Sequence, residues 1–206
     1  MPTVSKTFKY KLAPTSEQEH LMVRTVGLCN WLYNTALEQR ITAWKYHRIS
    51  LSYYDQAAEL PAIKEAFPEF RDVHSQVAQD TLKRIDKTYQ AFFARRKTGG
   101  KGGFPRFQGS NRYHSFTYPQ YHNGAYADNG LLVLSKIGRV RVIWSRPLQG
   151  TPKTVTISHE ADGWYVCFSC ANVPCQDRAR DRYRYGSDPL PDHRSGGACG
   201  QSQVAA

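Results

Sequence analysis

The chain has 206 residues, 40% of them hydrophobic, which is enough for one ordinary domain or two small ones with a real core. Its 28 lysine and arginine residues outnumber 17 acidic residues, so the net charge is +11 and the pI is near 9.5. The sequence contains no run of about 18 apolar residues and no export signal, so we expect a cytoplasmic protein without a membrane partner, whose basic charge meets a polyanion.

The first predicted element is a strand over residues 4–12, in which polar and apolar side chains alternate. One face of the strand carries Thr7, Lys9 and Lys11, and the opposite, apolar face carries Phe8, Tyr10 and Leu12. Either Thr15 or Ser16 then caps a long helix that runs to about Tyr46, and Glu19 stands three residues after Ser16 as in a capping box. Apolar residues on more than one side of this helix predict that it packs against several neighbours.

Further helices are predicted before the sequence changes period. Ser52 is the expected N-cap of a short helix over residues 53–60 that Pro61 stops, and residues 63–67 continue as another turn. A second long helix, over residues 74–96, carries a stripe that becomes aromatic toward its C-terminus: Ala78, Leu82, Ile85, Tyr89, Phe92 and Phe93. We interpret this stripe as core rather than as a platform for stacking bases.

After Gly103 the period is two, which predicts strands over residues 115–118, 130–134, 139–144, 153–159 and 164–172. Asn129-Gly130 and the segment 161–163 are the predicted hairpin turns. One strand before the helices and several after them predict an α+β fold, a small antiparallel β-barrel that is OB-like, closed by the first strand and interrupted by a helical insertion. Residues 175–206 have few aliphatic residues and no period, so we expect a disordered C-terminal tail.

The basic residues cluster in one stretch between the helices and the later strands. Between Lys87 and His159 the sequence has a single acidic residue, Asp128. The cations that we select as candidate nucleic-acid contacts are Arg95, Arg96, Lys97, Lys101, Arg106 and Arg112. The alternative is a solvated basic face, but such faces usually interleave acidic residues. In the same stretch we interpret Phe104 and Phe107 as a packed turn locked by Pro105.

The five cysteines do not predict a disulfide framework or a zinc site. Cys167 and Cys170 have C-x-x-C spacing but lie in a predicted strand, where residues three apart point to opposite faces. Cys175 and Cys199 are too far apart to be a second pair. We therefore expect half-buried thiols, with no metal and no cofactor.

Several motifs in this order resemble the TnpB-type (OrfB-type) family of insertion-sequence transposases, understood as RNA-guided DNA endonucleases. The resemblance spans residues 3 to about 174 and is carried by Lys6-Thr7-Phe8-Lys9-Tyr10-Lys11-Leu12-Ala13-Pro14-Thr15 with Gln18 and Leu21, Cys29-Asn30-Trp31-Leu32-Tyr33-Asn34, Ser75-Gln76-Val77-Ala78-Gln79, Gly103-Phe104-Pro105-Arg106-Phe107 and Gly163-Trp164-Tyr165-Val166. It implies a barrel called a wedge domain, at residues 1–14 and 100–174, and an inserted helical recognition lobe at 15–99, whose first helices are labelled helix-turn-helix.

The resemblance also implies partners, namely a structured guide RNA and duplex DNA. Tyr53, Ser75 and Gln79 would approach the DNA that flanks the target, while Lys97, Lys101 and Arg106 would hold RNA or DNA backbone. Gln and Ser can hydrogen-bond base edges, whereas Lys and Arg contact phosphate without reading sequence. For Gln79 the alternative is an ordinary solvent-facing helix position.

The family's catalytic RuvC-like domain and four-cysteine zinc element are expected after the last strand, and the sequence does not show them. We therefore expect a truncated binding protein with no catalytic residue, not an enzyme by itself. One alternative is a regulator that competes with the full-length transposase. The other is a metal-dependent nuclease that uses the tail acids, namely Asp177, Asp181, Asp188 and Asp192.

Codon degeneracy suggests why the RuvC-like sequence is missing. Read one base out of register, codons for residues 180–186 can spell Gly-Ile-Asp-(Ile or Thr)-Gly-Met, which resembles the first RuvC strand. Codons for residues 199–204 can likewise spell family-like sequence. We therefore predict a frameshift between residues 174 and 180, within the predicted tail.

Overall fold

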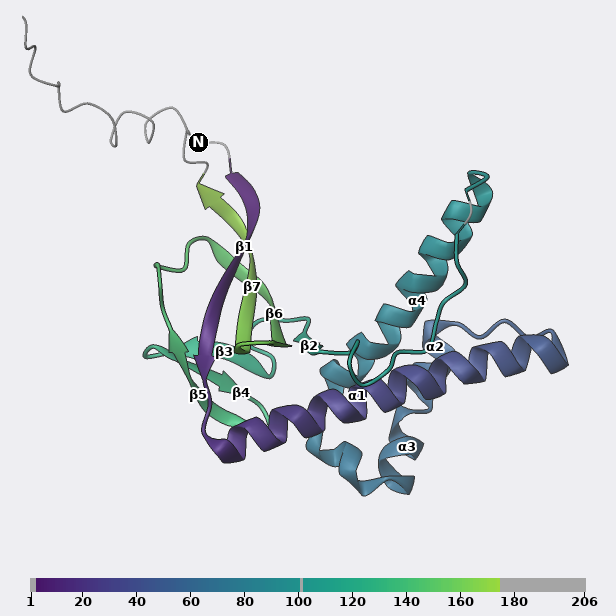
Figure 1. Ribbon diagram of the computed structural model, residues 1–206, viewed down its shortest axis with the longest axis horizontal. Helices are drawn as coiled ribbons and strands as arrows, with labels where there is room; N and C mark the ends of the chain where they lie inside the picture. The colour runs from purple at the N-terminus through teal and green to yellow at the C-terminus, as the bar shows by residue number, and fades with distance from the viewer. Residues whose placement is uncertain (1–2, 101, 175–206) are drawn as a thin grey trace, which may run out of the picture. The chain divides into compact units, whose positions relative to one another are not determined.

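The computed structural model describes residues 3–100 and 102–174, which belong to one compact unit that ends at Pro174 (Figure 1). In these residues one antiparallel sheet has the strand order β2-β6-β7-β1-β5-β4-β3. Its strands are β1 (Thr3–Ala13), β2 (Ser115–Tyr118), β3 (Ala125–Asp128), β4 (Leu131–Leu134), β5 (Gly138–Ile143), β6 (Thr151–Glu160) and β7 (Gly163–Pro174). The sheet curls into a nearly closed barrel, so the predicted α+β fold is confirmed.

The first strand, β1, lies in the middle of the sheet between β7 and β5, so it joins the two halves of the barrel. Phe8 of β1 pairs with Phe168 of β7, and Tyr10 pairs with Val166, so buried side chains meet on the inner face. The alternation in residues 4–12 therefore sets which face of β1 is buried. Tyr118, at the end of the edge strand β2, donates its hydroxyl to the carbonyl oxygen of Ser135, just after β4, at 3.1 Å.

One strand, β3, was not predicted. It has four residues, of which only Ala125 is buried, so it lacks the alternating apolar pattern that identifies a strand. The predicted Asn129-Gly130 turn does join it to β4, with positive φ angles of 47° and 80°. Two positive φ angles are the requirement of a type I′ hairpin, which explains the Asn-Gly pair.

The helix α1 (Ser16–Thr42) continues into a π-helical turn, η1 (Ala43–His47). Thr15 is the N-cap of α1. Thr15 Oγ1 accepts from the Gln18 backbone N–H at 3.3 Å, and Gln18 Oε1 accepts from the Thr15 N–H at 3.1 Å. Of the two predicted caps, Thr15 is therefore the one used. Glu19 has a different role, because its carboxylate accepts from Trp164 Nε1 at 3.2 Å.

Three short helices follow α1: α2 (Tyr53–Ala58), α3 (Leu60–Ala66) and the 3-10 helix η2 (Pro68–Asp72). Ser52 caps α2 as predicted, in a capping box with Asp55. The prediction that Pro61 stops a helix is wrong, because Pro61 lies in the first turn of α3. Proline is favoured there since the first backbone N–H groups of a helix have no partner within it.

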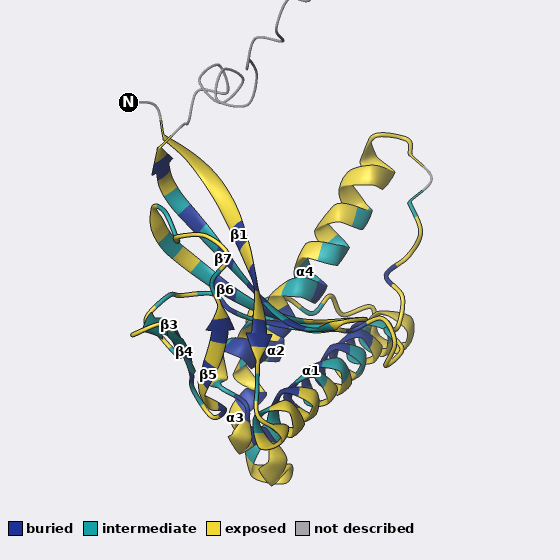
Figure 2. Ribbon diagram, turned by 60° about the vertical axis from the view of Figure 1, so that its left-hand side comes forward, coloured by how far each residue is buried: buried dark blue, intermediate teal, exposed yellow. Residues whose placement is uncertain are grey.

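The helix α4 (Ser75–Lys97) packs on α1 through its N-terminal half, and Figures 1 and 2 show its C-terminal half diverging from α1. Val77, Ala78, Leu82 and Ile85 are fully buried. Tyr89 is half-buried and packs against the core as interpreted. The interpretation of the whole stripe as core is wrong at its end, where Phe93 is 60% exposed and Phe92 is half-buried, because the two helices diverge there.

Arg84 fastens α4 to the barrel. Its Nη1 donates to the Ser115 carbonyl oxygen and its Nη2 to Thr117 Oγ1, both at 2.8 Å, while Nε pairs with Asp80 at 3.0 Å. The helical segment therefore attaches to β2, the strand that directly follows it in the chain. The proposed boundaries of the two domains, near residues 14 and 100, stay predictions.

Candidate nucleic-acid interface

The first group of predicted contacts lies at the C-terminal tip of α4. Arg95, Arg96 and Lys97 are all exposed there, where the partial negative charge of the helix end favours cations. The Arg96 guanidinium lies 5.9 Å from the centre of the Phe92 ring. Figure 1 shows this tip projecting away from the barrel, so these three cations are available to a partner.

The basic loop that follows runs back along α4 toward β2 (Figures 1 and 2). Arg106 and Arg112 are exposed on it, and Lys101 lies outside the described residues. The predicted cations are therefore strung along the length of α4 instead of gathering in one patch. Such a row matches the repeated charge of a nucleic-acid backbone better than a small anion.

None of these five cations is used in an ion pair within residues 3–100 and 102–174. The ion pairs there use other cations, namely Lys9, Lys11, Arg24, Arg40, Arg84 and Arg139. Within the described residues, no carboxylate therefore lies within ion-pair distance of Arg95, Arg96, Lys97, Arg106 or Arg112 to offset their charge.

The packed turn predicted at Phe104 and Phe107 is only half correct. Pro105 is buried, but Phe104 is 49% exposed and Phe107 is 53% exposed. Phe104 contacts Tyr89 and Phe92 edge to face, at centroid distances of 5.8 and 5.4 Å. The loop is thus anchored on α4 while its aromatic rings remain accessible.

The second group consists of Ser75 and Gln79, exposed one turn apart on α4. Lys83 continues the same row one turn later, and its ammonium group lies 5.5 Å from the centre of the Tyr53 ring. Burial raises the pKa of the Tyr53 hydroxyl, so it stays protonated and able to donate at neutral pH. Ser75, Gln79 and Lys83 therefore share one exposed row of α4, and Tyr53 adjoins this row through its contact with Lys83.

Two cations of this surface were missed in the sequence. Lys83 could have been found from its spacing, since it follows Gln79 by four residues. Lys64 had no such signal: its ammonium group, on α3, donates to Ser75 Oγ at 2.7 Å. Burial is the main cause that lowers the pKa of Lys64, followed by the nearby charge of Lys136. A contact between two separate helices is decided by tertiary packing and leaves no local pattern.

The described residues offer no evident place for a metal, because no group of three or more His, Cys, Asp or Glu side chains gathers in them. Cys170 is buried and Cys167 is half-buried on alternate sides of β7, as the strand interpretation predicts. The tail acids and the predicted frameshift lie outside the described residues. Among the described helices, none is long and apolar enough to cross a bilayer.

A curled barrel with a helical insertion carries a basic row whose described cations have no ion pair, an arrangement typical of proteins that bind nucleic acid. A helix-turn-helix domain model of the OrfB type from IS605 elements matches residues 1–48. In the structure the described part of this region is β1, one continuous helix α1 and the π-helical turn.

Two curated relatives extend the match. The chain is 33% identical over 180 residues to a "Putative RNA-guided DNA endonuclease" of Streptomyces pristinaespiralis, covering 84% of this chain and 43% of the relative. It is 32% identical over 165 residues to the "Putative RNA-guided DNA endonuclease InsQ" of Escherichia coli strain K12, covering 78% of this chain and 39% of the relative. The chain belongs to the TnpB-type (OrfB-type) family, and it spans about two fifths of the length of these relatives.

Proposed function

We propose that residues 3–174 are a nucleic-acid-binding segment that grips the scaffold of a guide RNA and contacts the duplex DNA flanking a target. The names of the two relatives suggest RNA guidance and DNA as the partners. The observation that carries the proposal is the row of cations at the tip of α4 and on the returning loop, which have no ion pair in the described residues.

The first group of residues, at the tip of α4 and on the basic loop, and the second group, on the exposed row of α4, differ in chemistry, and we propose different roles for them. Arg95, Arg96, Lys97, Arg106 and Arg112 would contact phosphate, which fixes position without reading sequence. Ser75 and Gln79 would reach base edges, because hydroxyl and amide groups can donate and accept hydrogen bonds there. Lys101 belongs to the first set by its place in the sequence.

Fluorescence anisotropy with a structured RNA and with duplex DNA over a salt series tests the proposal. The double variant Arg95→Ala/Arg96→Ala should bind more weakly, and the slope of log affinity against log salt should fall by about 1 for each phosphate that the variant no longer binds. The control is Arg24→Ala/Arg71→Ala, which removes the same charge from α1 and η2. Binding that is absent, insensitive to salt, or equally weakened by both pairs would refute the proposed surface.

Sequence reading is tested separately with Gln79→Ala. This variant should bind different DNA duplexes with more similar affinities, because one bidentate base contact contributes about 1–3 kcal/mol of discrimination. Arg106→Ala should instead weaken binding to all duplexes by the same factor. If Gln79→Ala retains full discrimination, Gln79 is a solvent-facing helix residue.

We propose no nuclease chemistry for the described residues, since they hold no cluster of metal-binding side chains. The hypothesis of a frameshift near residues 174–180 rests on codon degeneracy alone. The nucleotide sequence of the gene tests it: an open adjacent frame encoding RuvC-like sequence supports the hypothesis, and a closed one refutes it.

A further inference from the structure

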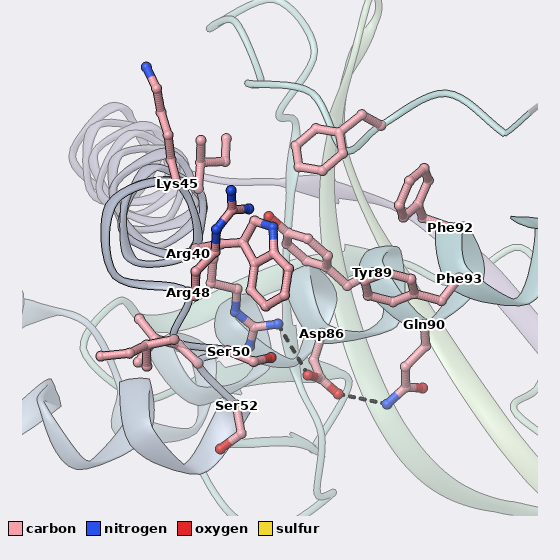
Figure 3. A pocket seen from close by; sticks show the side chains of 15 residues that line it. Arg40, Lys45, Arg48, Ser50, Ser52, Asp86, Tyr89, Gln90, Phe92 and Phe93 are labelled. Carbon is pink, nitrogen blue, oxygen red and sulfur yellow. Dashed lines mark hydrogen bonds and ion pairs between the residues drawn. The ribbon is translucent and has the colours of Figure 1, made fainter.

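The diverging ends of α1 and α4 enclose a pocket of about 880 Å³ (Figure 3). One wall is formed by the end of α1, by η1 and by the loop at residues 48–52, and the other by α4 from Asp86 to Phe93, with Phe104 of the basic loop. This volume is within the range of about 300–1,000 Å³ usual for small-molecule sites. The pocket is therefore large enough for a nucleoside with its phosphate.

The pocket is lined by aromatic rings that are open to solvent. Trp44 is 54% exposed, Phe93 60% and Phe104 49%, although rings of this size are normally covered. Phe92 lies between them, with ring-centre distances of 5.2 Å to Phe93 and 5.4 Å to Phe104. Exposed rings around a cavity are the arrangement on which unpaired bases stack.

The same lining carries three cations against a single carboxylate. Arg40 pairs with that carboxylate, Asp86, at 3.3 Å. Lys45 and Arg48 are not used in any ion pair of the described residues, and the Arg48 guanidinium lies 5.8 Å from the Trp44 ring centre. The remaining charge is positive, so a neutral or acidic ligand is favoured over a basic one.

Arg40 adds a donor that the described chain does not use. Its side chain is only 7% exposed, and Nε donates to Gln56 Oε1 at 2.7 Å. Its Nη2 is buried and has no hydrogen-bond partner in the described residues. A buried guanidinium donor without an acceptor costs free energy, and Arg40 carries that cost in the wall of the pocket.

We propose that this pocket, which we call the α1–α4 pocket, binds one unstacked nucleobase of a single-stranded nucleic acid. The base stacks among Trp44, Phe92 and Phe93, and the adjoining phosphates lie near Lys45 and Arg48. This inference rests on the proposed nucleic-acid binding and adds a second mode, in which the protein holds a base in addition to the backbone. Charge favours this occupant over an apolar protein segment, which would leave Lys45 and Arg48 unmatched.

The test uses the 206-residue chain and a single-stranded RNA oligonucleotide carrying one 2-aminopurine. Stacking on an aromatic ring quenches 2-aminopurine fluorescence, so binding should reduce emission. An otherwise identical oligonucleotide with an abasic position should bind about tenfold more weakly, since one base stacked on aromatic side chains contributes about 1–3 kcal/mol. The same titration, repeated at several salt concentrations, reports backbone binding independently.

Matched variants assign the effect to the pocket. Phe93→Ala should lower affinity for the base-bearing oligonucleotide about tenfold and leave the abasic oligonucleotide unchanged. Phe67→Ala is the control, because Phe67 is also exposed, at 45%, and lies outside the pocket lining. Lys45→Ala should lower the affinity for both oligonucleotides. Lys87→Ala, at an exposed position of α4 outside the pocket lining, should lower neither affinity to that extent. Thermal melting checks that each variant folds.

Each remaining outcome overturns the inference in a recognisable way. Salt-dependent binding with equal affinity for the base-bearing and abasic strands, and no quenching, rejects the pocket while the proposed function stands. Absence of binding to both oligonucleotides rejects the pocket, and absence of salt-dependent binding to structured RNA and duplex DNA as well rejects the proposed function too. Self-association in sedimentation that Phe93→Ala abolishes, without quenching, identifies a second copy of the chain as the occupant.

Discussion

Asn34 holds the backbone of Gln108 with two hydrogen bonds, across 74 residues of sequence. Asn34 Oδ1 accepts from the Gln108 N–H at 2.8 Å, and Asn34 Nδ2 donates to the Gln108 carbonyl oxygen at 2.9 Å. The side-chain amide therefore pairs with the peptide group as a neighbouring strand would. Asn34 thereby fastens the basic loop to α1 just after Arg106 and Phe107.

Asn34→Ala should release this loop. Removal of the two hydrogen bonds, one to each polar group of Gln108, should cost about 1–3 kcal/mol of unfolding free energy. Trypsin should cleave faster at Arg106 and Arg112, which are exposed on the loop. Urea denaturation and timed proteolysis measure the two effects. Asn123→Ala, whose side chain makes one exposed hydrogen bond to Gln120, is the control and should change neither.

Arg84→Lys should loosen the attachment of α4 to β2. Lysine keeps the charge opposite Asp80 but cannot donate in the fork that reaches Ser115 and Thr117. We expect a loss of about 1–3 kcal/mol in urea denaturation. Lys87→Arg, an exposed change on the same helix, should stay within about 0.5 kcal/mol. Equal stability of the two variants would contradict the role assigned to Arg84.

Two glycine-to-alanine changes should have opposite signs. Gly150 has φ +75°, and a Cβ there would clash with the Ala171 carbonyl oxygen and lie 2.8 Å from Val173 Cγ2, so Gly150→Ala should destabilise by more than about 1 kcal/mol. Gly27 is exposed within α1, and a Cβ there meets no atom within 4 Å. Gly27→Ala should stabilise by about 1 kcal/mol because alanine favours helix. Thermal denaturation of both variants side by side measures the signs.

Stability should depend on His74 at mildly acidic pH. Burial lowers the pKa of His74 below its ordinary value of 6.5, helped by the positive charges of Lys64 and Lys136. Its neutral Nδ1 accepts from the Gln76 N–H at 3.3 Å and so caps α4. His74 therefore binds a proton more readily in the unfolded chain than in the folded chain. The stability that neutral His74 contributes is complete above pH 6.5 and falls as the pH drops from 6.5 toward the folded-state pKa of His74.

His74→Asn tests that dependence, because asparagine can cap a helix without titrating. The variant should lose some packing against Tyr118, whose ring centre lies 5.6 Å from that of His74. Its stability should nevertheless change less between pH 7.5 and 5 than that of the parent chain. Urea denaturation at several pH values measures this, and parallel pH profiles would exclude His74 as the cause.

The candidate site was only partly predictable. The charge run between Lys87 and His159 identified the basic loop, since like charges that are close in sequence stay close in any fold. The approach of Tyr53 to Lys83, and of Lys64 to Ser75, could not be read from spacing, because each joins two different helices. The aromatic end of α4 was misread as core, because its helical period is the same whether or not a partner covers it.

The sequence by itself determined the local features of this protein. Alternation set the buried face of β1, the Asn129-Gly130 pair set a hairpin turn, and Ser52 set the start of α2, because each depends on hydrogen bonds or sterics within a few residues. Only the tertiary structure decided that α1 and α4 diverge, leaving Trp44 and Phe93 exposed around a pocket. Burial of a helical stripe depends on what reaches it from elsewhere in the chain, and that is a property of packing.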